Sequence, residues 1–269
     1  MYWFIGGDQR SFRAAQYLRE HGRCVHTYGV PQMKDQSLPQ QFSVVILPFP
    51  SFRGDRLSGE RNVEFSEILP RIGKGSRVYG GLLSGCREAM ETRGAQVIDL
   101  YDTEPLTTLN AIPTVEGALA LAIESSPITI HGANCLVIGA GRIGTLLARR
   151  LQAMGAQVTV AARSVGDRER IRAMGLEAEE SGSYHKGLGQ YEFLFNTVPA
   201  RILNREQLSQ LGKDGVLMEL ASAPGGFSPQ DCEALGLHGV YAPGLPGRFS
   251  PKTAGILYAR SILEREETL

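Results

Sequence analysis

Apolar and polar residues alternate along the first hundred residues in blocks that predict strands and helices in turn. Short apolar runs predict buried strands, and most of them are followed by a segment whose apolar residues have helical spacing. The predicted strands are 2–5, 24–28, 44–47, 77–79 and 96–99, and the predicted helices are 11–21, 64–72 and 86–93. This alternation predicts a parallel α/β domain of the Rossmann-like or flavodoxin-like kind.

The second half of the chain repeats the alternation around a glycine-rich turn. The apolar run Leu136–Ile138 leads into the turn, a segment with helical spacing follows, and residues 157–161 predict the next strand. Further predicted strands at 193–196, 215–220 and 240–241 each end in a loop of small residues. Loops of this kind let a ligand approach the backbone closely. We therefore predict a second parallel-sheet domain whose loops bind a ligand.

Two more helices flank the second domain. Residues 113–124 predict a helix in which Pro113 ends the preceding extended run and Thr114 is the N-cap. Residues 127–133 then lead into the next strand. A last helix, 252–265, closes the chain, and we expect it to pack back on the first domain.

The whole pattern predicts two α/β domains, each with a parallel sheet, and an interdomain cleft. We expect a substrate domain at 1–110, a crossing helix and linker at 111–132, and a Rossmann-like cofactor domain at 133–250. With 269 residues and 42% hydrophobic content, the chain can bury two modest cores or one large one. A reaction is expected in the cleft between such domains.

The glycine-rich turn is the most informative motif. Gly139, Gly141 and Gly144 have the GxGxxG spacing of a dinucleotide-binding unit. The first glycine permits a tight turn, the second lets a pyrophosphate approach the backbone, and the third lets helix and strand pack closely. The N–H groups of the following helix, which starts with Arg142 and Ile143, face the phosphates. The alternative is an ordinary strand–helix turn without a ligand.

The residues after the second strand of this unit indicate which dinucleotide binds. NAD-binding units usually carry Asp or Glu there, to bond the ribose 2′-OH, whereas this chain has Arg163 and Ser164. A guanidinium suits a 2′-phosphate, because its planar donors can bind two phosphate oxygens. We therefore predict NADP(H) rather than NAD(H). The alternative is that Arg163 is a solvated loop arginine.

The loops after the later strands complete the predicted cofactor site. They contribute Thr197, Val198, Pro199 and Ala221. Ser222 follows Ala221, and it is more suited to lining the cofactor than to attacking a substrate, because no GxSxG turn or partnered His supports a nucleophile.

Polar residues expected at the cleft are the candidates for catalysis and substrate binding. We assign Lys252, Glu116 and Ser222 to catalysis, and Thr114, Arg248 and Thr253 to substrate binding. Lys252 and Thr253 start the last helix, where free N–H groups could hold a carboxylate. The plainer interpretations are a surface lysine at 252 and, at Glu116, an acid that favours the helix macrodipole. The Gly6-Gly7-Asp8 turn lacks a third glycine, so we expect it to face substrate rather than a second dinucleotide.

Composition excludes several classes of partner. The chain has 28 basic and 28 acidic residues, so nothing favours nucleic acid or an anionic membrane. No apolar run approaches the roughly 18 residues that span a bilayer, and the N-terminus does not resemble a signal peptide. The four cysteines are scattered, as are the histidines, which favours reduced thiols in a cytoplasmic protein and predicts no metal site.

The predicted cleft lacks a pair of residues that simple hydroxy-acid chemistry requires. Two-domain 2-hydroxy-acid dehydrogenases use an Arg for the carboxylate and a His paired to an acid for the proton. The corresponding strand end here has the sequence ASAPGG, and His238 lies just before a strand. This absence argues against simple alcohol or ketone hydride transfer.

Several segments together resemble one family, the dehydrogenase-like component of dipicolinate synthase from spore-forming bacteria, known as its A component. The resemblance covers nearly the whole chain. The segments are IGGD at 5–8, VVILP at 44–48, IPTVEGALALAI at 112–123, TIHG at 129–132, IGAGRIG at 138–144, AARS at 161–164, NTVPARIL at 196–203, LASAPGG at 220–226 and APGLPGRFSPKTAG at 242–255. The segments IPTVEG and APGLPG…PKTAG are the specific ones.

The resemblance implies a reaction, a partner and a setting. It implies NADP-linked oxidation of a dihydrodipicolinate-type intermediate of the lysine pathway to pyridine-2,6-dicarboxylate. It also implies that the partner is a flavoprotein-like dipicolinate synthase B subunit, and that the chain works in the cytoplasm of the mother cell during sporulation. The residues fit a small dicarboxylate, because Arg248, Lys252 and the loop glycines can contact carboxylates.

Two other functions stay open from sequence. One is a different two-domain oxidoreductase of a small carboxylate, such as a hydroxy- or amino-acid dehydrogenase. The other is a non-catalytic subunit that binds NADP(H) or supports its partner. The sequence also leaves open whether the chain forms a homo-oligomer.

Overall fold

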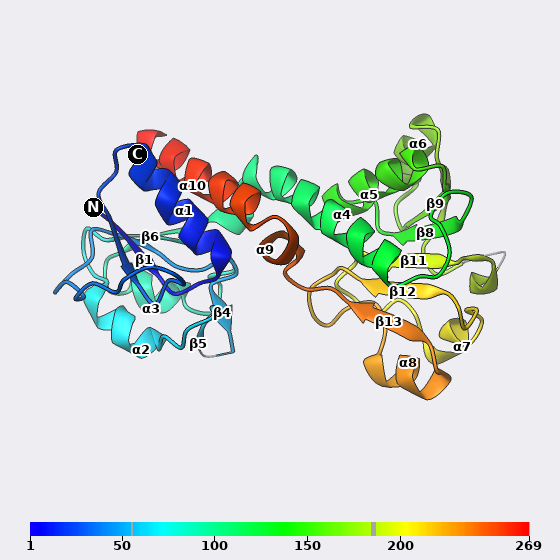
Figure 1. Ribbon diagram of the computed structural model, residues 1–269, viewed down its shortest axis with the longest axis horizontal. Coiled ribbons are helices and arrows are strands. Elements are labelled where there is room, and N and C mark those ends of the chain that lie inside the picture. Colours follow the sequence, from blue (N-terminus) through cyan, green and yellow to red (C-terminus); the bar gives the residue numbers. More distant parts are fainter. Residues whose placement is uncertain (55, 184–186, 269) are drawn as a thin grey trace. The chain divides into compact units, whose positions relative to one another are not determined.

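The computed structural model describes residues 1–54, 56–183 and 187–268 (Figure 1). The chain forms two compact units, and the division falls after Asn110 and after Leu245. The first unit therefore consists of two chain segments, 1–110 and 246–269, whereas one continuous segment, 111–245, forms the second. Each unit is built around a parallel β-sheet, which confirms the predicted fold class.

The sheet of the first unit has five parallel strands in the order β2-β1-β3-β6-β7. The strands are β1 (Tyr2–Ile5), β2 (Val25–Tyr28), β3 (Val44–Ile46), β6 (Arg77–Gly80) and β7 (Gln96–Asp99). Its helical segments are α1 (Gln9–Glu20), α2 (Phe65–Ile68), η1 (Leu69–Arg71), α3 (Arg87–Glu91) and η2 (Leu100–Asp102). Two short antiparallel strands, β4 (Phe52–Arg53) and β5 (Arg56–Leu57), form a separate small sheet.

Apolar side chains cover both faces of this sheet, as expected for parallel strands with helices on either side. Successive residues of a strand point to opposite faces. Accordingly Tyr2 and Phe4 belong to one buried cluster and Trp3 and Ile5 to another. The unbroken apolar runs that predicted buried strands therefore reflect two hydrophobic layers.

The C-terminal segment completes the first of these layers. Helix α10 (Pro251–Thr268) packs along α1, so closely that a Cβ atom at Gly255 would lie 2.5 Å from the carbonyl oxygen of Arg10. Tyr258 is buried in the cluster and its hydroxyl donates to the carbonyl oxygen of Leu47. Helix α10 is thus part of the core of the first unit (Figure 1).

The far end of α10 is held by one carboxylate. Glu266 accepts two hydrogen bonds from Arg77, each 2.8 Å long, and further ones from the hydroxyls of Tyr79 and Tyr2. Burial alone raises the pKa of Glu266, but the hydrogen bonds outweigh this effect and the pKa lies below its ordinary value. The contacts attach the last turns of the helix to strands β1 and β6.

The sheet of the second unit has six parallel strands in the order β10-β9-β8-β11-β12-β13. They are β8 (Asn134–Ile138), β9 (Gln157–Ala162), β10 (Glu177–Glu180), β11 (Phe193–Asn196), β12 (Val216–Glu219) and β13 (His238–Tyr241). The helical segments are α5 (Arg142–Ala153), α6 (Val165–Ala173), η3 (Leu188–Gln190), α7 (Arg205–Leu208) and α8 (Pro229–Leu235). Figure 1 shows α5 and α8 on opposite sides of the sheet.

Helix α4 (Leu106–Glu124) differs from the helix predicted at 113–124 in two ways. It begins before Pro113, which lies inside the helix, so Thr114 is not an N-cap and Glu116 is not in a first turn. The apolar stripe Ala111, Val115, Ala118 and Ala122 runs past the proline with helical spacing and is buried. Burial of this stripe offsets the hydrogen bond that a proline removes.

The same helix is also longer and more apolar than the sequence pattern predicts. Helix α4 has 19 residues and contains an 18-residue window with a mean hydropathy of 1.4, so its length and composition would allow it to cross a membrane. The prediction that no such run exists was wrong, because it divided the helix at Pro113. Half of the apolar window is buried in the protein, and core helices of soluble proteins have the same character. Helix α9 (Leu245–Phe249), like α4, contains a boundary between the units.

Candidate functional site

The glycine-rich turn after β8 is packed too tightly for any other residue at two of its positions. Gly139 has a φ of +107°, and a Cβ atom there would lie 2.3 Å from Thr197 Oγ1. A Cβ atom at Gly144 would lie 2.0 Å from the carbonyl oxygen of Gly139. The first and third glycines therefore have the conformational and packing roles that the motif predicts.

The second glycine of the turn has open space around it. Gly141 is the N-cap of α5, and a Cβ atom there would meet nothing within 4 Å. The first backbone hydrogen bond of the helix runs from Thr145 N to Gly141 O. The N–H groups of Ile143 and Gly144 therefore have no acceptor within the helix. This arrangement fits the pyrophosphate of a dinucleotide.

Basic side chains gather at the end of β9. Arg163 is exposed, and Ser164 caps α6, its hydroxyl accepting a hydrogen bond of 3.0 Å from Asp167 N. Arg168, which sequence reasoning missed, donates from Nη1 to the carbonyl oxygens of Ala162 at 3.0 Å and Arg163 at 2.8 Å. The signal in the sequence was a basic residue in the first turns of the helix that follows β9.

Two other arginines of α6 are engaged elsewhere. Arg170 forms an ion pair with Asp167, and Arg172 forms one with Glu169. Arg163 and Arg168 have no ion-pair partner among the described residues of this unit. Their two positive charges are therefore available to an anionic ligand at the end of β9.

The loop after β11 lies directly against the glycine turn. Thr197 donates from its hydroxyl to the carbonyl oxygen of Ile138 at 2.8 Å. Asn196 holds the next residue, donating to Val198 O at 2.9 Å and accepting from Val198 N at 3.1 Å. Thr197 and Val198 are half-buried and Pro199 is exposed. The structure thus brings two of the predicted cofactor residues, Thr197 and Val198, next to Gly139.

A buried acid lies beneath the loop after β12, and sequence reasoning missed it. Glu219 accepts hydrogen bonds from Asn196 Nδ2 at 2.7 Å, Ala221 N at 3.0 Å and Gly226 N at 2.7 Å. Burial raises the pKa of Glu219, although these hydrogen bonds act in the opposite direction. The signal in the sequence was an acid at the last position of an otherwise apolar strand, Val216–Glu219.

The predicted catalytic and substrate residues are distributed over both units. Thr114, Glu116 and Ser222 belong to the second unit, where Thr114 is buried and the other two are exposed. Arg248, Lys252 and Thr253 belong to the first unit and are exposed. Lys252 and Thr253 lie in the first turn of α10, as the sequence predicts. The guanidinium of Arg248 lies 4.9 Å from the ring centre of Phe249.

The Gly6-Gly7-Asp8 turn has a structural role at the end of β1. Asp8 caps α1 and pairs with the guanidinium of Arg10 at 2.7 Å. The turn is covered by a neighbouring loop, since Gly7 N donates to Ser58 O and Glu60 N donates to Gly7 O. These contacts fix the start of α1.

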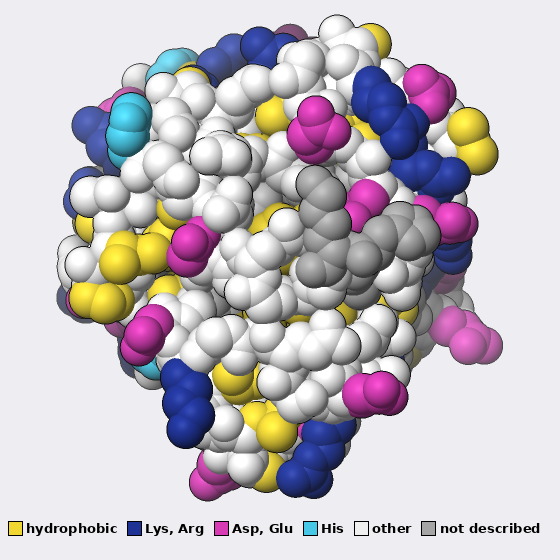
Figure 2. All heavy atoms as spheres, turned by 90° about the vertical axis from the view of Figure 1, so that its right-hand side faces the viewer, with side chains coloured by type: hydrophobic (Ala, Val, Ile, Leu, Met, Phe, Trp, Pro, Cys, Tyr) yellow, Lys and Arg dark blue, Asp and Glu magenta, His cyan; other side chains and the backbone are white. Residues whose placement is uncertain are grey.

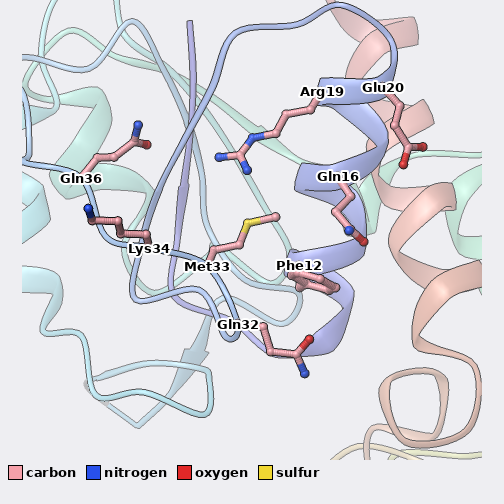
Figure 3. A pocket seen from close by; sticks show the side chains of 8 residues that line it. All are labelled: Phe12, Gln16, Arg19, Glu20, Gln32, Met33, Lys34 and Gln36. Carbon is pink, nitrogen blue, oxygen red and sulfur yellow. The ribbon is translucent and has the colours of Figure 1, made fainter.

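The first unit also has a surface pocket of about 500 Å³ between α1 and the segment 32–36 (Figure 3). Its lining residues are Phe12, Gln16, Arg19, Glu20, Gln32, Met33, Lys34 and Gln36. None of the predicted site residues lies there. Acidic and basic groups both face it, and Arg19 is already bonded to the carbonyl oxygen of Val25.

Metal ions and highly charged partners would need clustered ligands or clustered charges among the described residues. Within 1–54, 56–183 and 187–268, no group of three or more His, Cys, Asp or Glu residues could hold a metal ion. On the face shown in Figure 2, basic and acidic side chains are interspersed. This mixture agrees with the composition of the chain, which has equal numbers of basic and acidic residues.

Comparison with protein families identifies the nature of the second unit. Residues 114–224 match the D-isomer specific 2-hydroxyacid dehydrogenase, NAD binding domain. The matched range contains the glycine turn, the loops after β9 and β11, and the start of the loop after β12. The second unit is therefore a nicotinamide-dinucleotide-binding domain of an oxidoreductase.

Two relatives, one of them compared both by sequence and by structure, resemble the whole chain rather than this domain alone. The dipicolinate synthase A protein of Bacillus subtilis (strain 168) is 32% identical over 272 residues, which cover 95% of this chain and 92% of that protein. The crystal structure of its counterpart from Bacillus halodurans has a TM-score of 0.87 at 27% identity, covering 98% of this chain and 97% of that one. The crystal structure of the Bacillus subtilis protein has a TM-score of 0.84 at 30% identity, with coverage of 99% and 96%.

Proposed function

The chain belongs to the dipicolinate synthase A family, and from this premise we propose that it makes dipicolinate with NADP⁺ as oxidant. The proposed substrate is a dihydrodipicolinate-type intermediate of the lysine pathway. The observation that carries the proposal is the basic end of β9 beside the glycine turn. It combines a dinucleotide-binding turn with two arginines where NAD-binding units have an acid.

The choice of NADP(H) depends on Arg163 and Arg168. Arg168 bonds to the carbonyl oxygens of Ala162 and Arg163, so its guanidinium is held at the strand end where the ribose of a dinucleotide lies. Arg163 projects into solvent from the same point. Two guanidinium groups and the hydroxyl of Ser164 offer donors to a 2′-phosphate. A ribose 2′-OH would find no carboxylate there.

The proposed chemistry requires little from a dedicated base. The glycine turn, Arg163 and Arg168 would hold NADP⁺, which would supply the hydride acceptor. The dihydropyridine ring would give up one hydride and one proton to become the aromatic product. We assign the carboxylates of the substrate to Arg248, Thr253 and the start of α10. Lys252, Glu116 and Ser222 are the candidates for handling the proton, and Thr114 is a candidate for substrate contact.

The proposal also covers the cellular setting. The relatives are named as the A component of a synthase, and we propose that the chain works with a flavoprotein-like B subunit. The proposed place is the cytoplasm of the mother cell of a sporulating bacterium.

The deciding experiment follows dipicolinate formation and NADPH absorbance together. It starts from an enzymatically generated lysine-pathway intermediate and is run with and without the B-type subunit. We expect one NADPH for each dipicolinate formed. Pyridinedicarboxylate that forms without reduction of a nicotinamide would contradict the assignment.

One observation favours a second candidate, a dehydrogenase of a small hydroxy- or amino-acid. The second unit matches a domain model named for 2-hydroxyacid dehydrogenases. Purified protein given a panel of such acids would then reduce NADP⁺ without any lysine-pathway intermediate. If NADP(H) binds tightly and no turnover occurs even with the partner subunit, the chain is instead a cofactor-binding subunit.

A further inference from the structure

The loops after three neighbouring strands of the second unit are joined by one hydrogen-bond network. Thr197 links the loop after β11 to the end of β8, and Asn196 links it to Glu219 at the end of β12. The connection is reinforced at Gly226, whose carbonyl oxygen accepts from Ile202 N at 3.0 Å and Leu203 N at 2.9 Å. The two loops therefore cannot shift independently.

The loop after β12 folds closely around the Glu219 carboxylate. A Cβ atom at Gly225 would lie 2.8 Å from Glu219 Oε2, and one at Gly226 would lie 2.5 Å from Asn196 Nδ2. Gly225 also has a φ of +71°. Glycines at these positions thus bring the backbone N–H of Gly226 within hydrogen-bond distance of the carboxylate.

The contacts of Glu219 exclude it as a proton acceptor for a substrate. Glu219 is only 5% exposed. Both of its carboxylate oxygens already accept hydrogen bonds, Oε1 from Asn196 and Ala221 and Oε2 from Gly226. A group in this position acts through the loop that it holds. The amide of Asn196 is likewise fully engaged, with Val198 on one side and Glu219 on the other.

The strand order indicates which part of a dinucleotide lies over these loops. From β8 the chain proceeds to β9 and β10 on one side, and then to β11, β12 and β13 on the other. The point where the order reverses, between β8 and β11, is where open α/β sheets bind ligands. With the 2′-phosphate at the end of β9, the nicotinamide half extends over the loops after β11 and β12.

We propose that Asn196 and Glu219 are positioning residues that fix the loops 197–199 and 221–226 as the platform for the nicotinamide half of the cofactor. This inference rests on the proposed function, since it takes NADP(H) as the ligand. Neither residue touches the cofactor. Both act by holding the backbone of Val198, Ala221 and Gly226 in place.

The test compares Glu219→Gln and Asn196→Ala with the unaltered full-length chain. Each protein is titrated with NADP⁺ and with adenosine 2′,5′-bisphosphate, which has the 2′-phosphate but no nicotinamide. We expect each variant to bind NADP⁺ about tenfold more weakly, because a buried donor or acceptor loses its partner. Binding of the bisphosphate should change by less than about twofold.

Glu192→Gln is the matched control. Glu192 also accepts a hydrogen bond from a backbone N–H, that of Asn134 at 2.6 Å, but it lies just before β11, at the opposite end of the strand. We expect it to leave the affinity for both ligands unchanged. The double variant should lose about as much NADP⁺ affinity as either single variant, because the two residues act as a pair.

The outcomes separate this inference from the proposed function. If the unaltered chain binds no NADP⁺, the proposed function is wrong. If it binds NADP⁺ and the variants bind it equally well, the positioning role is wrong. Equal losses for NADP⁺ and the bisphosphate would also overturn the positioning role, because a general loosening of the unit has that effect.

Discussion

At the scale of the residue, the proposed preference for NADP(H) depends on charges that have no ion-pair partner among the described residues of the second unit. On α6, Arg170 and Arg172 are neutralised by acids within the same helix, whereas Arg163 is exposed beside the strand end. A surface ion pair contributes little to the stability of the fold, but the acid partly neutralises the charge of the arginine. An arginine without such a pair retains its full attraction for a phosphate.

Replacing Arg163 tests this difference. We expect Arg163→Ala to weaken binding of NADP⁺ by roughly 10- to 100-fold, because a charge-assisted hydrogen bond is lost. Binding of NAD⁺ should change by no more than about twofold. Titrations of both nucleotides measure the ratio. Arg170→Ala is the control, since its charge is already paired with Asp167, and it should leave both affinities as they are. Equal losses for the two nucleotides would refute a 2′-phosphate role for Arg163.

At the scale of the element, the C-terminal end of α10 depends on one partly buried carboxylate. Glu266 has hydrogen bonds from Arg77, Tyr79 and Tyr2, on two strands of the first sheet. A Gln at this position keeps the shape but loses the charge. We expect Glu266→Gln to lower the free energy of unfolding of the first unit at neutral pH by about 1–3 kcal/mol.

The effect of Glu266 should depend on pH in a defined direction. Its pKa in the folded protein lies below the ordinary value of 4.5, so the charged form is favoured by folding. Its contribution is therefore present above pH 4.5 and is lost as the pH falls through the lower, folded-state pKa. Denaturation of Glu266→Gln and the unaltered chain should converge in acid. Glu267→Gln, on the exposed side of the same helix, should show no such pH-dependent difference.

The helices and strands differ in how well the sequence alone predicts them. Strands such as Phe193–Asn196 are predictable because an apolar run between turn residues has few alternatives. The predicted start of helix α4 was wrong, because Pro113 outweighed an apolar stripe that continues past it. Burial of the apolar stripe of α4 outweighed the tendency of Pro113 to end a helix.

The site was predictable only where one chain segment carries the whole signal. Gly139, Gly141 and Gly144 lie within six residues, and their roles follow from spacing. Glu219 and Asn196 are 23 positions apart and meet only because β11 and β12 are neighbours in the sheet. Arg168 turns back to the end of β9 through its side-chain conformation, which sequence spacing does not specify.

At the scale of the whole molecule, the first unit depends on a segment that is distant in sequence. Helix α10 contributes Tyr258, Ala259 and Ile262 to the cluster around Ala14, Ala15 and Leu18. A chain ending at Ser250 would expose this apolar face of α1. We expect the first unit to unfold in this shortened chain, because the lost burial exceeds the few kcal/mol by which a domain is stable.

Hydrogen exchange of the backbone amides checks this expectation unit by unit. In the shortened chain, amides of β1 and β3 should lose their protection, while those of β8 and β11 keep it. Protection retained in β1 would show that the first sheet folds without α10. Loss of protection in β8 would show that the two units do not fold separately.

The division of the first unit into two segments has a consequence for synthesis on the ribosome. Residues 111–245 emerge complete while the nascent chain still lacks α10, so the dinucleotide-binding unit has all its residues first. Domains usually fold in the order in which they emerge. If the first unit needs α10 as we expect, the N-terminal sheet, although translated earliest, closes its core only after the last helix has been made. The second unit is therefore the first part of the nascent chain that we expect to fold.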